Sequence, residues 1–125
     1  MRKPGTDEQN VQPSDVLCDF CHREWDPDEP MIEGHHGSCI CGKCLRTAYT
    51  DVVLHENNPA GEEYKCTVCL EAGEDRQALD RAGEPGWRSP MYDEALICKR
   101  CIELAAKALH KDKAYEWTKP GVETT

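Results

Sequence analysis

CDFCHREWDPDEPMIEGHHGSCICGKC, residues 18–44, holds two CxxC pairs separated by a spacer, and this stretch decides the fold. A second stretch, 66–101, repeats the arrangement. A CxxC turn brings two sulfurs close enough to share one zinc ion at about 2.3 Å, and a second pair completes a closed tetrahedron. The chain is therefore expected to bind two Zn²⁺. The predicted ligands are Cys18, Cys21, Cys41 and Cys44 in the first site and Cys66, Cys69, Cys98 and Cys101 in the second.

Nine cysteines in 125 residues form either a disulfide framework in a secreted protein or metal sites in a reducing compartment. Residues 1–15, MRKPGTDEQNVQPSD, contain no apolar stretch that would direct secretion, and no later stretch could span a membrane. We therefore expect a cytoplasmic protein with reduced cysteines. Only 6% of the residues are aromatic, so metal rather than a large apolar core should set its stability.

The formal net charge is −9, with 15 Lys and Arg against 24 Asp and Glu. A zinc ion held by four thiolates carries a net charge of −2, so two such sites would bring the total to −13. Nucleic-acid binders grip phosphates with a surplus of basic residues, so this balance argues against that class. One local basic strip, Lys107, Lys111 and Lys113, more simply complements the dipole at the end of a helix.

The cysteine pairs divide the chain into two copies of one unit. Nineteen residues separate the two pairs in the first copy and 28 in the second, which predicts a charged surface insertion at 71–86 with one helical turn. Polar composition and turn formers predict disordered tails at both ends and a linker between the copies. The expected segments are a tail (1–16), the first zinc module (17–57), the linker (58–64), the second zinc module (65–118) and a tail (119–125).

Each second CxxC pair opens an amphipathic helix, because apolar residues recur at helical spacing after it. These residues are Leu45, Ala48, Tyr49, Val52 and Val53 in the first copy and Ile102, Ala105, Ala106 and Leu109 in the second. The first helix should run to about His55. Ahead of each helix we expect a short β-hairpin, with a turn at Gly34–Gly37 in the first copy and near Asp93, between Arg88 and Ile97, in the second.

Other residues near the first site have competing interpretations. Cys39 is expected to be a spare buried thiol, and the alternative is that it replaces Cys41 as a ligand. His35 and His36 are expected in the solvated turn of the hairpin rather than on the metal. The CDFCH motif at 18–22 also fits haem attachment, but that would require export and would leave the second pair of the module unexplained.

The first copy resembles the N-terminal zinc-binding domain of the ClpX unfoldase, a four-cysteine treble-clef module. The matching features are C-x-F-C at Cys18–Cys21, the group Met31, Ile32 and Gly34, and I-C-x-x-C-L from Ile40 to Leu45. The second copy, from Cys66 to about Lys113, keeps both pairs and the helix opening, but its insertion weakens the likeness. The resemblance implies a small metal-stabilised α+β fold of two treble-clef-like zinc modules in tandem, each a zinc knuckle, a β-hairpin and a helix.

In that family the module is a dimer that docks adaptors and substrates for the attached ATPase. No phosphate-binding GxxxxGK[ST] loop occurs here, so the unfolding activity is not carried over. The resemblance implies a protein-interaction module, an adaptor or regulator with a protein or peptide partner. It also suggests that the linked copies pack as an intramolecular pseudo-dimer through helix residues such as Tyr49, Val52 and Leu109, the alternative being a homodimer.

The candidate partner-binding residues are apolar side chains of the hairpins and helices. They are Trp25, Met31, Ile32, Tyr49, Val52, Trp87 and Leu109. Three tryptophans, Trp25, Trp87 and Trp117, are expected to cover small cores, and the alternative is that they are exposed anchors for a partner. An enzyme is not expected, because closed four-cysteine sites leave no position for water and no catalytic triad, HExxH or paired-carboxylate motif occurs. The alternative function is a zinc-ribbon-like nucleic-acid-binding or transcription regulator, whose binding would fall steeply with salt.

Overall fold

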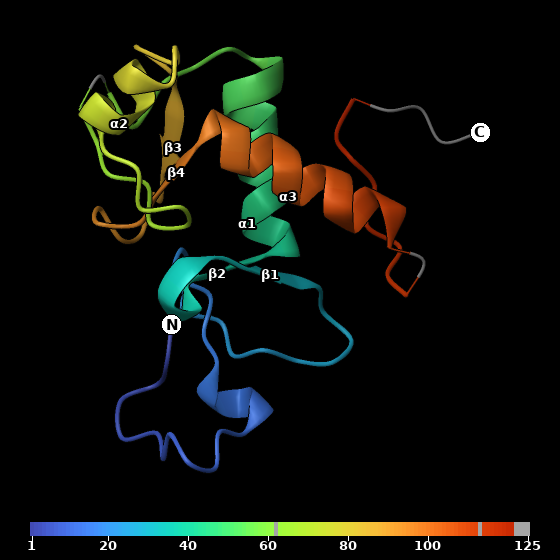
Figure 1. The fold of residues 1–125 in the computed structure, drawn as a ribbon. Coiled ribbons are helices and arrows are strands. Elements are labelled where there is room, and N and C mark those ends of the chain that lie inside the picture. The colour runs from blue at the N-terminus through green and yellow to red at the C-terminus, as the bar shows by residue number, and fades with distance from the viewer. Residues whose placement is uncertain (62, 113, 122–125) are drawn as a thin grey trace.

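In its described residues the protein has a small α+β fold built from two antiparallel hairpins and three α-helices (Figure 1). The computed structural model describes residues 1–61, 63–112 and 114–121. Its elements in chain order are η1 (Pro13–Asp15), β1 (Met31–Glu33), η2 (His35–Gly37), β2 (Cys39–Cys41), α1 (Gly42–Ala48), η3 (Tyr49–Leu54), α2 (Gly73–Ala78), β3 (Gly86–Arg88), β4 (Leu96–Cys98) and α3 (Lys99–Lys111). None of the helices among these residues is long and apolar enough to cross a membrane.

The two hairpins have matching registers. In the first, Ile32 pairs with Ile40, and in the second, Trp87 pairs with Ile97. Both hairpins were expected, but the second begins at Gly86, two residues before the predicted start. Its strand starts earlier because the glycine backbone pairs with Cys98, in a place where a Cβ atom would lie 2.7 Å from the ring of Tyr64. Each hairpin ends at a cysteine, Cys41 or Cys98, and a helix begins at the next residue.

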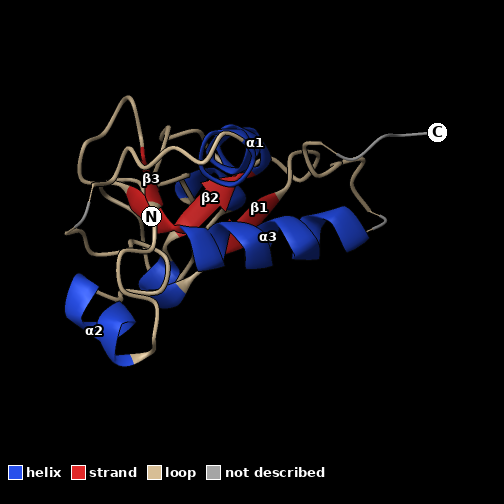
Figure 2. Ribbon diagram, turned by 90° about the horizontal axis from the view of Figure 1, so that it is seen from above, coloured by secondary structure: helices blue, strands red, loops and turns tan. Residues whose placement is uncertain are grey.

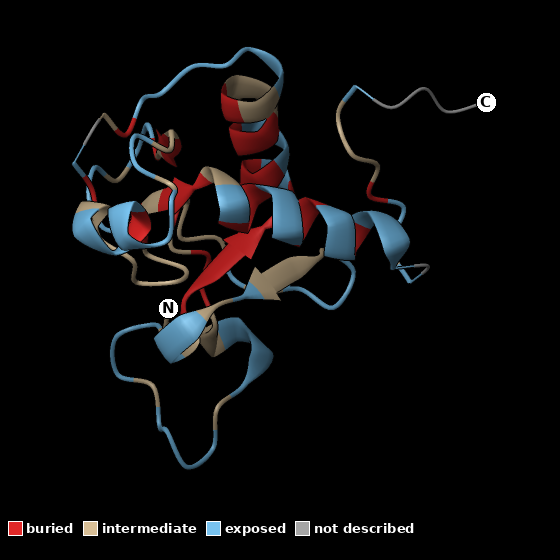
Figure 3. Ribbon diagram, turned by 45° about the horizontal axis from the view of Figure 1, so that its top comes forward, coloured by how far each residue is buried: buried red, intermediate tan, exposed pale blue. Residues whose placement is uncertain are grey.

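The helical pattern of the sequence is confirmed on both helices. In the first copy α1 continues directly into η3, a π-helical turn, and the run is capped at His55, as expected. Of its predicted apolar residues, Leu45, Ala48, Tyr49 and Val52 are buried, and Val53 is half-buried against the same core. In α3 the buried face consists of Cys101, Ile102, Ala105, Ala106 and Leu109, while the outer face is exposed (Figure 3).

The two modules share one hydrophobic core. Figure 1 shows α1 and α3 crossing in the middle of the molecule, and α3 also contacts η3. Tyr49 and Val52 of the first copy belong to the same buried cluster as Leu109 of the second. The copies therefore pack on each other through the helix faces that the sequence marks as apolar.

The knuckle of each module, the turn around its first CxxC pair (18–21 or 66–69), also packs against the hairpin of the other module. The Ser89 hydroxyl after β3 donates a 2.6 Å hydrogen bond to the carbonyl oxygen of Phe20, and Phe20 packs on Trp87 with ring centroids 5.7 Å apart. The reciprocal contact joins the first hairpin to the second knuckle, since the His35 N–H donates to the Val68 carbonyl at 2.8 Å. This exchange is the approximate twofold arrangement of a pseudo-dimer.

Residues 1–16, expected to be a disordered tail, instead lie along the first module. The Lys3 N–H donates to the Asp15 carbonyl at 2.7 Å, Arg2 and Val16 form an antiparallel bridge, and the Lys3 ammonium pairs with Glu24. The segment has few apolar side chains and is held by backbone hydrogen bonds and an ion pair. Amino-acid composition does not predict such contacts, so the segment looked disordered. In Figure 1 it forms the dark blue loop below the hairpin of β1 and β2.

The segment expected as linker and the end of the second zinc module also make specific contacts. In the linker the Ala60 N–H donates to the Gly86 carbonyl at 3.0 Å, so this segment continues the second hairpin. Near the C-terminus Trp117 is buried on α1, where its ring nitrogen donates to the Gly42 carbonyl at 2.9 Å and Arg46 lies over its ring. Residues 62 and 122–125, which belong to the predicted linker and tail, lie outside the described residues.

Candidate metal centres

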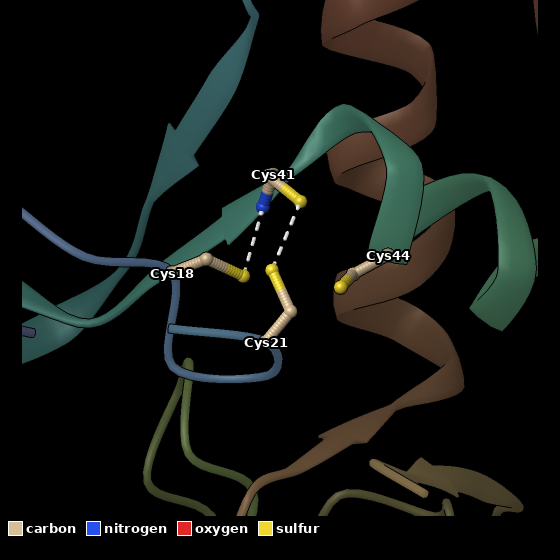
Figure 4. A group of neighbouring side chains, drawn as sticks. All are labelled: Cys18, Cys21, Cys41 and Cys44. Atoms are coloured by element: carbon tan, nitrogen blue, oxygen red, sulfur yellow. Dashed lines mark hydrogen bonds between the residues drawn. The ribbon is translucent and has the colours of Figure 1, made fainter. Parts of the chain in front are cut away.

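The first four-cysteine cluster joins a knuckle in the N-terminal part of the chain to the start of α1. Cys18 and Cys21 come from the knuckle, Cys41 is the last residue of β2, and Cys44 lies in the first turn of α1. Figure 4 shows the four sulfurs facing one another. All four lie within 4.8 Å of each other, and those of Cys21 and Cys41 are 3.7 Å apart.

The second cluster repeats this geometry with Cys66, Cys69, Cys98 and Cys101, again within 4.8 Å of one another. The Cys66 and Cys101 sulfurs are 3.9 Å apart, and those of Cys69 and Cys98 are 3.8 Å apart. Four thiolates placed tetrahedrally around zinc at 2.3 Å would be separated by about 3.8 Å. The spacing of both clusters therefore fits a zinc ion, and the eight predicted ligands are the residues that the structure brings together.

Each knuckle is a tight turn closed by its own backbone. The Cys18 N–H donates to the Arg23 carbonyl at 2.9 Å, and the His22 N–H donates back to the Cys18 carbonyl at 2.8 Å. Cys66 makes the same two bonds with Glu71 and Leu70. The residue after the second cysteine has a positive φ in both turns, 59° at His22 and 67° at Leu70, which points the paired sulfurs to one side.

Backbone N–H groups are also aimed at the sulfurs. The Cys18 sulfur accepts from the N–H groups of Phe20 at 3.4 Å and Cys41 at 3.3 Å. In the second cluster, the Cys66 sulfur accepts from Cys69 at 3.5 Å and Cys98 at 3.4 Å. Such donors stabilise thiolate over thiol, as does the position of each second pair at the start of a helix.

The four thiols of a cluster cannot all lose their protons without a cation between them. Hydrogen bonds shared with Cys18 and Cys41, together with burial, raise the pKa of the Cys44 thiol far above its usual range. The pKa of the Cys101 thiol is raised in the same way, by hydrogen bonds shared with Cys66 and Cys98 and by burial. A divalent cation removes this repulsion, and an all-sulfur, tetrahedral and largely buried donor set favours Zn²⁺ with no open position for water. Bound zinc would cross-link knuckle, hairpin and helix.

The remaining candidate ligands lie outside both clusters. Cys39, at the start of β2, is buried outside the cluster, its sulfur is 3.5 Å from the Gly37 carbonyl, and burial raises the pKa of its thiol. His35 and His36 are in the exposed turn η2. Within the described ranges, the two four-cysteine clusters are the groups of three or more His, Cys, Asp or Glu side chains close enough to hold an ion.

Comparison with known families agrees with this geometry for the first module. Residues 16–52 match the family model of the ClpX C4-type zinc finger. The chain carries a ClpX-type zinc finger. The second cluster lies outside the matched residues, although it repeats the knuckle, hairpin and helix of this zinc finger. Searches of curated proteins and of solved structures found no match.

Four of the seven predicted partner-binding residues are core residues. Tyr49, Val52, Trp87 and Leu109 are all less than a tenth exposed, which corrects their assignment as surface anchors. They are buried because the two modules pack together through them. The other three, Trp25, Met31 and Ile32, are half-buried. Trp25 and Met31 line a hollow of about 240 Å³ beside the first zinc finger, together with Val16, Cys39, Tyr115, Arg2 and Glu33.

Two arginines of the insertion were missed as structural residues. Arg76 is only 2% exposed and donates to the carbonyls of Tyr64 at 2.6 Å and Glu71 at 2.7 Å, so it ties together the two ends of the second knuckle. Arg81 lies within reach of the second cluster, with its Nη2 atom 3.7 Å from the Cys98 sulfur. Both stand in a charged stretch, which normally indicates a solvated surface, so the sequence carries no signal that separates them from exposed arginines.

Proposed function

We propose that the chain is a zinc-stabilised protein-interaction module, an adaptor or regulator related to the substrate- and adaptor-recognition domain of a Clp-type unfoldase, and not an enzyme. The ClpX-type zinc finger carries this proposal. The sulfur clusters support a structural rather than a catalytic role for the metal, since all four ligand positions of each are supplied by cysteine. The partner would be a protein or peptide, and the chain itself would be a monomer with its two copies packed as a pseudo-dimer.

The hollow beside the first zinc finger is the surface that we propose for recognition. Its half-buried Trp25 and Met31 offer apolar contact area on a rigid support, because β1 is paired to the strand that carries a zinc ligand. Arg2 and Glu33, which also line it, would give polar contacts beside an apolar anchor, as in many interfaces. A short peptide segment with one apolar side chain suits a hollow of this size.

Affinity capture tests this proposal. The zinc-loaded protein would be immobilised and exposed to lysate of its native cell, and bound proteins identified by mass spectrometry. We expect Clp components or a defined client, lost with the Trp25→Ala/Met31→Ala variant. The control is Leu79→Ala, because Leu79 is 59% exposed and lies in α2's C-cap, away from this hollow. Capture that survives the double variant would contradict the proposed surface, and capture of polymerase or nucleic acid would contradict the proposed class.

The second candidate is a nucleic-acid-binding or transcription regulator, and one observation favours it. Lys107, His110, Lys111 and Lys119 line a hollow at the C-terminal end of α3, in an otherwise acidic chain. Binding through phosphates would weaken steeply with salt, whereas an apolar peptide contact would not. Titration of the protein with labelled DNA and RNA at several salt concentrations distinguishes the two candidates. Lys113 of the predicted strip lies outside the described residues.

A further inference from the structure

The two sulfur clusters are closely matched in burial and in backbone donors. In each, three of the ligands are buried and the second knuckle cysteine is half-buried. In each, the first knuckle cysteine accepts two backbone N–H bonds, at 3.3 and 3.4 Å for Cys18 and at 3.4 and 3.5 Å for Cys66. Neither burial nor these backbone bonds would therefore make one site more reactive than the other.

A side chain breaks this equivalence. Arg81 places its Nη2 atom 3.7 Å from the sulfur of Cys98, a ligand of the second site. In the part of the chain that the structure describes, the sulfurs of the first cluster receive hydrogen bonds only from backbone groups and from one another. The difference arises from the stretch 71–86, which holds the residues that make the second spacer, at 28 residues, longer than the first, at 19.

The guanidinium of Arg81 is held in place on its other sides. Its Nη1 atom is 2.8 Å from a carboxylate oxygen of Glu71, and its Nε atom pairs with Glu84. The second oxygen of Glu84 accepts a 2.6 Å bond from the Arg100 N–H, inside the CxxC pair of α3. The Arg81 side chain is only 21% exposed, so it is a partly desolvated and preoriented donor rather than a mobile surface charge.

We propose that Arg81 is a positioning residue of the second zinc site and makes that site more resistant to thiol-directed reagents than the first. A cationic donor on a zinc-bound thiolate withdraws electron density from the sulfur and offsets the net negative charge of the site. When such a thiolate adds to the double bond of a maleimide, a sulfur–carbon bond forms, the neighbouring carbon takes a proton from water, and the sulfur loses its affinity for zinc. Arg81 slows this step at Cys98 and shields the approach to it.

Zinc release tests the order of the two sites. The protein loaded with two zinc ions would be treated with N-ethylmaleimide in the presence of a chromogenic zinc chelator, and samples would be quenched for peptide mass spectrometry. We expect two phases of one zinc each, with the four ligands of the first site modified in the fast phase. Simultaneous release of both ions, or earlier modification of the second site, would overturn the proposal.

Variants assign the difference to Arg81. Outer-shell partners of metal ligands change metal affinity by about 10- to 100-fold, and we expect Arg81→Gln to speed the slow phase at least about tenfold without changing the fast phase. Arg23→Gln is the matched control, because Arg23 forms a half-exposed pair with Glu29 at 3.8 Å, and it should change neither phase. Arg81→Lys keeps the charge but not the three-way contact, and should give an intermediate rate.

The result does not depend on activity or on any partner. Each variant would first be compared with the wild type by circular dichroism, and if Arg81→Gln has lost helicity the comparison is made with Arg81→Lys. A slow phase that is unchanged in a folded Arg81 variant would show that this side chain does not protect the site. An equal acceleration of both phases would show a general loss of stability and would also overturn the proposal.

Discussion

Ser89 joins the two modules through a single hydroxyl. It is 1% exposed, donates to the Phe20 carbonyl at 2.6 Å and accepts from the N–H groups of Met91 and Tyr92. Replacement by alanine would leave these buried groups without a partner, and we expect Ser89→Ala to lower the free energy of unfolding by about 1 to 3 kcal/mol. Urea denaturation with excess zinc measures this effect. Ser14→Ala, at an exposed position in η1, is the control and should change little.

Arg76 performs a similar task within the second module. Its guanidinium also lies 3.8 Å above the ring of Tyr64, in addition to the two carbonyls that it binds. Arg76→Met keeps most of the side-chain volume and removes the donors, so the free energy of unfolding should fall by about 2 to 4 kcal/mol. The half-exposed Arg23 is the control, and Arg23→Met should change it by less than about 0.5 kcal/mol. Equal free energies of unfolding for the two variants would show that the buried hydrogen bonds of Arg76 do not stabilise the fold.

At the scale of elements, we expect the first turns of the two long helices to depend on bound zinc. α1 and α3 begin directly after a ligand, Cys41 or Cys98, and carry a second ligand in the first turn. Removing the metal leaves four crowded thiols at each helix start, so we expect cooperative loss of the helical signal when a strong chelator is added under reducing conditions. Circular dichroism with parallel zinc measurement follows this loss. Helices that persist after both zinc ions have left would contradict a metal-dependent fold.

The features that could be predicted are those that depend on residues close together in the sequence. Paired cysteines give the eight ligands, and helical spacing gives the buried faces of α1 and α3. The packing of the N-terminal segment and the partner of the Trp117 ring were not predictable in the same way, because they depend on residues distant in the chain, such as Gly42 for that ring. The prediction that Val52 and Leu109 bind a partner protein was wrong for the same reason. Their apolar pattern is the same whether they contact another protein or the other module.

At the scale of the whole molecule, each module contacts the other through its first CxxC turn. Phe20 contacts the second hairpin, and Val68, at the same place in the second knuckle, contacts the first. A Cβ atom on Gly34 would lie 2.5 Å from a methyl group of Val68, so the two copies approach as closely as the backbone allows. Since this arrangement already covers the apolar helix faces of both modules, we propose that the full chain is monomeric.

An isolated first module tests this arrangement. A fragment of residues 17–57 with zinc would expose Tyr49, Val52 and Phe20, which the second module buries in the full chain. We expect the fragment to self-associate through this face, because a second copy can take the place of the missing module, whereas the full chain should elute as a monomer. Light scattering after size exclusion gives both masses. Val52→Asp should abolish association of the fragment, while Thr47→Asp, on the exposed face of α1, should not. A folded, monomeric wild-type fragment would show that the face does not drive pairing, and that the contacts between modules follow from the linker that joins them.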